Sequence, residues 1–294
     1  MSIWVLLVLF YGIAKGIRDI IKKKALTQNT VMEVLFVYTF ITFIFCLPEA
    51  KEAFEPIETK FYFLIALKSF IIFLAWILSF KAIDNIPISI YGIVDLSRIL
   101  FTTLFGLIVL KEAASINQIL GFILVVSGLV FLKVYPSIIQ RINTNKEGSR
   151  YVKEEYKTIF ILMCLGSCLL NAMSACMDKV YMKHVTSSQL QFWYMLFLTI
   201  FYGLYFIITK THINSSVWKN GWIWLLSILF FLADKALFIA NGHVDSKVTI
   251  MTLIKQSACI ISILAGKFIF KEKNIGYKLI CALIVLTGIV VSVL

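Results

Sequence analysis

Long apolar segments recur along the chain, and short clusters of charged residues separate them. An apolar helix of about 20 residues can cross a bilayer core of about 30 Å. Lipid leaves unpaired backbone groups unsatisfied, and the alternating pattern of a membrane β-barrel is absent. The pattern therefore predicts an all-α integral membrane protein with ten transmembrane helices. We expect these helices at residues 2–24, 31–47, 61–82, 86–110, 116–134, 158–183, 189–209, 218–242, 246–270 and 276–294.

One apolar segment occurs twice, with an offset of 160 residues. Residues 88–112 read ISIYGIVDLSRILFTTLFGLIVLKE, and residues 248–272 read VTIMTLIKQSACIISILAGKFIFKE. Both copies end in Lys-Glu, and the apolar segments that follow them also share a late glycine, Gly128 in one and Gly288 in the other. A repeat of this period indicates an internal duplication.

The duplication predicts two five-helix units, residues 1–134 and 158–294, joined by the polar linker 135–157. Because five is odd, the second unit should enter the membrane in the opposite orientation. Such an inverted repeat typically forms a solute site near the bilayer midplane.

The net charge of +12 comes mostly from Lys and Arg residues at the ends of the apolar segments. There they orient a membrane protein, so the charge does not indicate a nucleic-acid partner. With the N-terminus outside, eighteen of these cations lie at cytoplasmic ends and six at outer ends. We therefore expect a multi-pass protein of the plasma membrane with both termini outside. The N-terminal apolar stretch has no basic n-region and reads as a first span, not as a cleaved signal peptide.

Six charged residues lie inside the apolar segments. They are Lys68, Arg98, Lys235 and Lys255, together with Asp95 and Asp234. A charge at this depth costs at least about 2.5–3.5 kcal/mol on insertion scales, so each needs a partner, water or a function. These residues predict a polar site within the membrane.

Two matched helix faces carry the core of this site. Tyr91, Asp95 and Arg98 share one face of the fourth segment, and Lys255 with Gln256 occupies the corresponding place in the ninth. Asp95 aligns with Lys255, so the two side chains could pair or could alternate between each other and the solute. The alternative interpretation is a fixed ion pair that only holds the two halves together.

Each remaining candidate residue for the site also has a purely structural interpretation. Asp234 and Lys235 point about 100° apart on their helix, and we assign Asp234 to the cavity and Lys235 to snorkelling or to a neighbouring helix. Lys68 and Asn171 are candidate solute ligands, and Trp76 could line the cavity or belong to the core.

A nearby acid on the first helix, Asp19, aligns with Asp178 and should pair locally with Lys15 and Lys23.

The charges inside the segments sum to +2, which favours an anionic or zwitterionic solute over a cation. No glutamate lies in the middle of an apolar segment, which argues against a multidrug cation exporter. The three histidines and six cysteines have no spacing typical of a metal site. We therefore expect no catalytic residue, metal or cofactor.

The ten segments, the two Lys-Glu endings and the late glycines resemble the EamA-type transporters of the drug/metabolite transporter superfamily. The chain departs from the family pattern at Ile99 and Cys259, where members commonly carry a proline. The resemblance implies a secondary transporter of a small metabolite that works by alternating access.

We therefore expect a transporter of a small polar solute, coupled to a proton gradient or to a counter-solute. Asp95 and Asp234 are the candidate coupling carboxylates, and Tyr91, Arg98, Lys255, Gln256, Asn171, Trp76 and Lys68 are the candidate solute ligands. A flippase for a lipid-linked head group and a non-transporting scaffold or sensor subunit are alternatives, and a membrane enzyme ranks last. The pattern indicates membrane lipid as a partner and leaves the oligomeric state open.

Overall fold

The computed structural model describes residues 3–110, 116–143, 157–243, 246, 251 and 254–293. Within these residues the chain forms helices and no strand. The helices are α1 (Ile3–Ala25), α2 (Val31–Cys46), α3 (Ala50–Ala53), α4 (Thr59–Asn85), α5 (Ile88–Asp95), α6 (Arg98–Leu110), α7 (Ile116–Asn143), α8 (Thr158–Tyr181), α9 (Ser187–Thr209), α10 (Ser215–Trp218), α11 (Gly221–Gly242), α13 (Ser257–Phe268) and α14 (Ile275–Val293), with a 3-10 turn η1 at Leu47–Glu49.

Five stretches of the described chain are long and apolar enough to cross a membrane. They are Val31–Ala53, Thr59–Asn85, Thr158–Tyr181, Ser187–Thr209 and Gly221–Gly242. The expectation of a multi-pass, all-α membrane protein agrees with these helices. The first helix is equally long, but Lys and Arg residues occupy its second half.

Several predicted segments differ from the observed helices, and the ninth, 246–270, is interrupted by a turn at Gln256. The fourth segment is divided at Leu96 and Ser97 into α5 and α6. The fifth was expected to end at residue 134, but α7 continues to Asn143 and takes up the first part of the predicted linker. Residues 144–156 of that linker, and the Lys-Glu pair at 111–112, lie outside the described residues.

Polar residues at the helix ends explain where several helices begin. The Thr30 side chain accepts a hydrogen bond from the Glu33 backbone N–H, and the Glu33 carboxylate accepts one from the Thr30 backbone N–H. Thr186 and Gln189 form the same capping box at α9. Such caps satisfy N–H groups that the first helical turn leaves unpaired.

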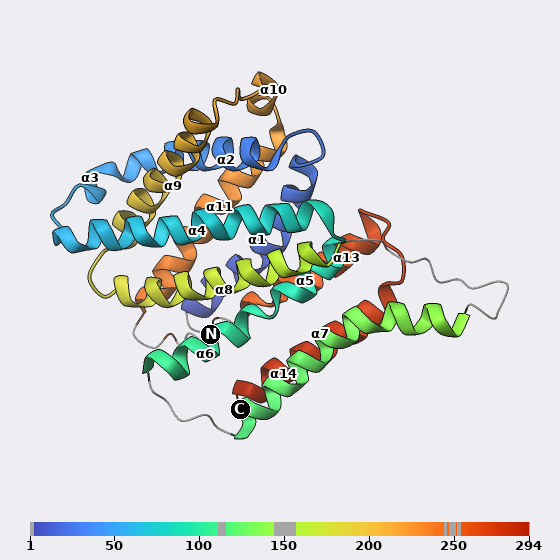
Figure 1. Ribbon diagram of the computed structural model, residues 1–294. Helices are drawn as coiled ribbons and strands as arrows, with labels where there is room; N and C mark the ends of the chain where they lie inside the picture. The colour runs from blue at the N-terminus through green and yellow to red at the C-terminus, as the bar shows by residue number, and fades with distance from the viewer. Residues whose placement is uncertain are drawn as a thin grey trace.

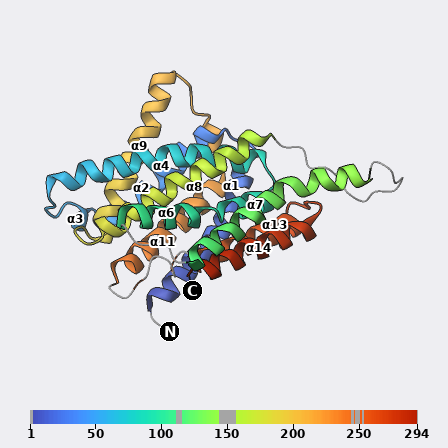
Figure 2. The same cartoon turned by 60° about the horizontal axis from the view of Figure 1, so that its bottom comes forward.

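Helices from the two ends of the chain pack against each other. The first helix, α1, contacts α11 and α13, while α4 contacts α8 and α9. The pair α7 and α14 lies side by side along one flank of the bundle (Figures 1 and 2). The chain therefore folds with its halves intertwined, because helices of residues 1–134 take most of their partners from residues 158–294.

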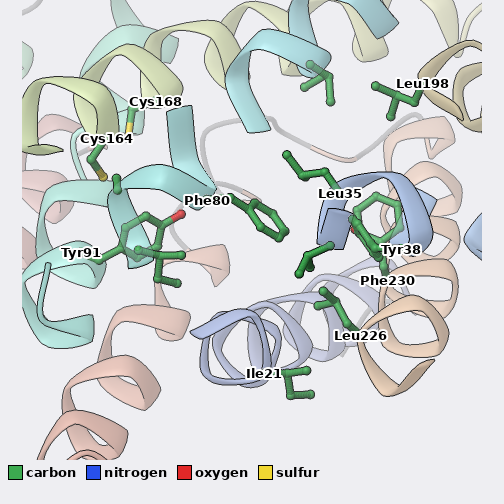
Figure 3. Close-up of a cluster of buried hydrophobic side chains, with 14 of the residues drawn as sticks. Ile21, Leu35, Tyr38, Phe80, Tyr91, Cys164, Cys168, Leu198, Leu226 and Phe230 are labelled. Carbon is green, nitrogen blue, oxygen red and sulfur yellow. The ribbon is translucent and has the colours of Figure 1, made fainter. Parts of the chain in front are cut away.

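The apolar core runs between α1, α2, α4, α9 and α11. Figure 3 shows the Tyr38 and Phe230 side chains together, with Leu226 below them and Leu35 between them and Phe80. The centroids of the Tyr38 and Phe230 rings are 5.3 Å apart in an edge-to-face arrangement. This aromatic core forms one wall of the cavity described next.

Candidate functional site: a charged cavity between the two halves

A cavity of about 110 Å³ lies in the middle of the bundle. Its walls come from α1, α2, α4, α5, α6, α8, α9 and α11 and from the residues just before α13. The lining residues are Tyr11, Lys15, Arg18, Asp19, Lys22, Tyr38, Lys68, Ile72, Trp76, Ser79, Phe80, Tyr91, Arg98, Thr102, Asn171, Ser174, Ala175, Asp178, Tyr194, Phe230, Asp234, Leu237, Phe238, Lys255 and Gln256.

Asp95 connects two of the cations that line this cavity. Its carboxylate pairs with Lys15 of α1 and accepts a hydrogen bond of 2.7 Å from Arg98 Nη2. Asp95 itself is 4% exposed and lies behind the cavity wall. The predicted partner of Asp95 was Lys255, but in the structure the Asp95 carboxylate forms ion pairs with Lys15 and Arg98.

The first helix supplies two further ion pairs at the cavity. Arg18 lies 3.3 Å from the Asp234 carboxylate of α11, and Lys22 lies 2.9 Å from Asp19 one turn away. Arg18 is 4% exposed, and its guanidinium also faces the Phe230 ring at 4.8 Å. These interactions place the polar face of α1 inside the bundle.

Lys68 and Asp178 form a further buried pair, between α4 and α8. Their charged atoms are 3.0 Å apart, and the Lys68 side chain is 2% exposed. Lys68 Nζ also lies 3.7 Å from the centre of the Tyr194 ring. A cation over an aromatic face gains electrostatic stabilisation, which partly offsets the cost of burying the charge.

Lys255 differs from the other cations of the cavity. Among the residues that the structure describes, no carboxylate lies within ion-pair distance of it. Its ammonium group lies 5.5 Å from the centre of the Tyr11 ring. Lys255 thus contributes a positive charge that no neighbouring acid in the described chain neutralises.

Aromatic residues also line the cavity, among the charged ones. The Trp76 ring is 5.3 Å from the Tyr38 ring and 5.1 Å from the Phe230 ring, measured between centroids. The Tyr91 hydroxyl is 2.7 Å from the Ser79 hydroxyl on the neighbouring helix. Trp76 therefore belongs to the aromatic core and also borders the cavity, so both interpretations of this residue hold together.

The backbone changes its helical pattern where the charges lie. At the α5–α6 junction the N–H groups of Leu96 and Ser97 donate to carbonyls three residues back, at 3.2 and 3.0 Å. The thiol of Cys168 donates to the Val94 carbonyl at 3.8 Å. A turn also interrupts the matched segment at Gln256. The two segments are therefore interrupted at corresponding positions, since Leu96 aligns with Gln256 at the offset of 160 residues.

Eight of the nine residues predicted for the site line this one cavity, and the ninth, Asp95, binds two of the lining cations. Lys235 lies elsewhere, as expected, and pairs with Glu49 at 2.8 Å.

The sequence interpretation missed Lys15, Arg18 and Lys22, which were assigned to the cytoplasmic end of the first helix. Asp19 pairs locally, as expected, but its partner is Lys22, whereas Lys15 and Lys23 had been named. The signal that could have found these residues is their shared helix face at spacings of three and four.

The arrangement is suited to binding a polar solute. Most of its carboxylates and cations are already paired with each other, and the residues that the structure describes include no cluster of His, Cys, Asp and Glu able to hold a metal ion. A buried polar chamber of this kind, reached through a membrane, is the usual form of a solute site.

Comparison with known proteins agrees with a transporter. A search of curated proteins found no match by sequence. A solved structure titled "Crystal structure of protein" resembles the whole chain, with a TM-score of 0.62 and 14% identity over 98% of this chain and 95% of that one. That likeness shows a shared fold and nothing about the solute.

A family model gives the clearest result. The model of the EamA-like transporter family matches residues 2–134, which include α1 to α6 and the cations of α1. Residues 2–134, a little under half of the chain, are therefore similar to the EamA-like transporter family, which is part of the drug/metabolite transporter superfamily.

Proposed function

We propose that this protein is a secondary active transporter that moves a small anionic or zwitterionic metabolite across the plasma membrane by alternating access. The observation that carries the proposal is the central cavity, where cations outnumber carboxylates. Arg98, Lys255, Gln256, Tyr91, Asn171, Trp76 and Lys68 contact the solute, and Asp95 and Asp234 couple its movement to a proton or a counter-solute.

Alternating access requires two halves that can move around one site. The proposed architecture has ten transmembrane helices in two inverted five-helix repeats, with both termini outside. The matched interruptions at Leu96 and Gln256 support it, because a helix that is already interrupted can bend there without losing further backbone hydrogen bonds. The ion pairs across the halves, Arg18 with Asp234 and Lys68 with Asp178, are contacts that a solute or proton could exchange.

A second candidate is a flippase for a lipid-linked head group, and one observation favours it. An apolar groove of about 240 Å³ lies beside α5, α7 and α8. Its lining residues are Val94, Val126, Leu129, Val130, Leu132, Thr158, Ile161 and Leu165. The groove could hold a hydrocarbon chain next to Val94, the neighbour of Asp95, while a polar head group occupied the cavity.

The test is a thermal-shift screen of the purified protein in detergent, since a ligand that binds only the folded state raises the melting temperature by mass action. The panel contains amino acids, sugar phosphates, nucleotide sugars, quaternary amines and short-chain lipids. We expect an anionic or zwitterionic class to stabilise wild type and to be taken up into liposomes. Arg98→Ala and Lys255→Met should stay folded and lose both effects.

Lys60→Met is the matched control, because Lys60 is 61% exposed and distant from the cavity. It should respond to the solute as wild type does. Stabilisation by quaternary amines alone would refute the proposal, and stabilisation only by molecules with an acyl chain would favour the flippase.

A further inference from the structure

We infer that the solute of this cavity is a compact dianion, with two negative charges held close together. The inference rests on the proposed transport function and specifies its substrate class. It follows from how the buried charges pair, where the unpaired charge lies and how large the cavity is.

The cavity has two more positive charges than negative ones. Six cations line it, namely Lys15, Arg18, Lys22, Lys68, Arg98 and Lys255. Three lining carboxylates and Asp95 behind the wall oppose them, which leaves an excess of two.

The excess is concentrated in one part of the cavity. Arg18, Lys22 and Lys68 each have a carboxylate of their own, at 3.3, 2.9 and 3.0 Å. Asp95 must serve both Lys15 and Arg98, and Lys255 has no acidic partner in the described chain. The two surplus charges therefore lie on the Lys15–Arg98 side and on Lys255, at the place where both repeat segments are interrupted.

The charge of the solute follows from the low dielectric constant of the membrane interior. A zwitterion would leave both surplus charges in place, and a monoanion would leave one, whereas a dianion neutralises the cavity. The volume of about 110 Å³ is below the roughly 300–1,000 Å³ of pockets for drug-sized ligands, so the solute must be compact. A phosphate monoester and a short dicarboxylate both meet these conditions.

Pairs of ligands that differ by one charge at constant shape test the inference. Methyl phosphate, a dianion at pH 8, is compared with methyl sulfate, a monoanion. Succinate is compared with succinamate in the same way. Dissociation constants are measured by titration calorimetry on the full-length protein in detergent.

We expect the dianion of at least one pair to bind about tenfold or more tightly than its partner, and the pair that responds identifies the phosphate or the dicarboxylate. Lys255→Met should reduce this ratio towards one, while Lys255→Arg should preserve it. If Lys255→Met does not fold, Asp178→Asn adds a surplus positive charge and should increase the ratio instead.

Equal binding of both members in both pairs, no binding of either dianion, or an unchanged ratio in Lys255→Met would overturn the inference. Binding and liposome uptake of a zwitterionic amino acid, dependent on Arg98, would sustain the proposed function and reject the dianion. Failure of every charge class to bind or be transported would reject the proposed function itself.

Discussion

Asp95 holds two of the cavity's cations in place, because its carboxylate forms ion pairs with residues of two helices. Lys15 reaches it from α1, and Arg98 reaches it from the first turn of α6. The Cys168 thiol lies 3.7 Å from the same carboxylate. Removing one partner of a buried ion pair leaves a charge that neither water nor another group compensates.

Asp95→Asn should therefore destabilise the protein by about 3–5 kcal/mol, the range for breaking buried ion pairs. The free energy of unfolding in mixed micelles, titrated with a denaturing detergent, provides the measurement. Glu58→Gln is the control, because Glu58 pairs with Lys60 at the surface and both side chains are more than half exposed. Its effect should stay within about 1 kcal/mol. Equal stability of the two variants would contradict the role given to Asp95.

From the sequence, residues whose charge lies deep in an apolar segment were expected at a polar site, and their roles toward a solute stay predictions. Lys68, Arg98 and Asp234 are such cases, and all three line the cavity. The sequence interpretation failed for Lys15 and Arg18, because a cation near the charged end of a helix has the same local pattern whether it anchors at the lipid surface or points inward. Only the partners Asp95 and Asp234, far away in the sequence, distinguish the two cases.

Among the described helices, α7 and α14 make the most extensive contact, and Gly288 lies where they pack closely. A Cβ added at Gly288 would lie 2.8 Å from the Gly121 carbonyl oxygen and 2.8 Å from Leu124 Cβ. Backbone atoms cannot rotate away as a side chain can, so the helices would have to separate. Small residues at such crossings are the common means of close helix packing in membranes.

Gly288→Ala should lower the stability of the protein by about 1–3 kcal/mol, as expected for overpacking. The thermal midpoint of unfolding in detergent would record the change. Gly221→Ala is the matched control, since a Cβ at Gly221 meets no atom within 4 Å. That variant should melt at the wild-type temperature or slightly above it. A wild-type midpoint for Gly288→Ala would show that α7 and α14 are not held together at this crossing.

The helices themselves were largely predictable, since apolar length determines where a membrane helix can form. The division of the fourth segment was not. Neither Leu96 nor Ser97 is a helix breaker, and the nearest proline, Pro87, lies at the start of α5. Tertiary contacts with distant helices gather at this interruption, where Lys15 pairs with Asp95 and the Cys168 thiol lies 3.8 Å from the carbonyl oxygens of Val94 and Asp95.

For the whole molecule, the predicted orientation in the membrane stays the same when the cations of α1 that line the cavity are left out of the count. Lys15, Arg18 and Lys22 line the cavity and no longer count as anchors at the membrane surface. Removing these three from the eighteen cytoplasmic cations leaves fifteen against six. The bias that places both termini outside therefore keeps its sign.

Epitope tags at the N-terminus and at the C-terminus should both be accessible to antibody on intact cells. A tag inserted in the linker 135–157 provides the internal control, because that segment is expected in the cytoplasm and should be labelled only after permeabilisation. Accessibility of the linker tag with protection of both terminal tags would reverse the proposed orientation. Opposite results for the two terminal tags would contradict an even number of membrane crossings.

The charges of α1 also have a consequence for how the protein is made. The local pair of Asp19 and Lys22 can form as soon as the helix does. The acidic partner of Lys15 is Asp95, 80 residues later in the sequence, and that of Arg18 is Asp234, 216 residues later. At a synthesis rate of about 5–20 residues per second, Arg18 is translated about 10–40 s before Asp234. Throughout that interval Arg18 lacks its acidic partner, because the acid of its own helix, Asp19, pairs with Lys22. We therefore expect the first helix to reach its final position only after α11 has been synthesised.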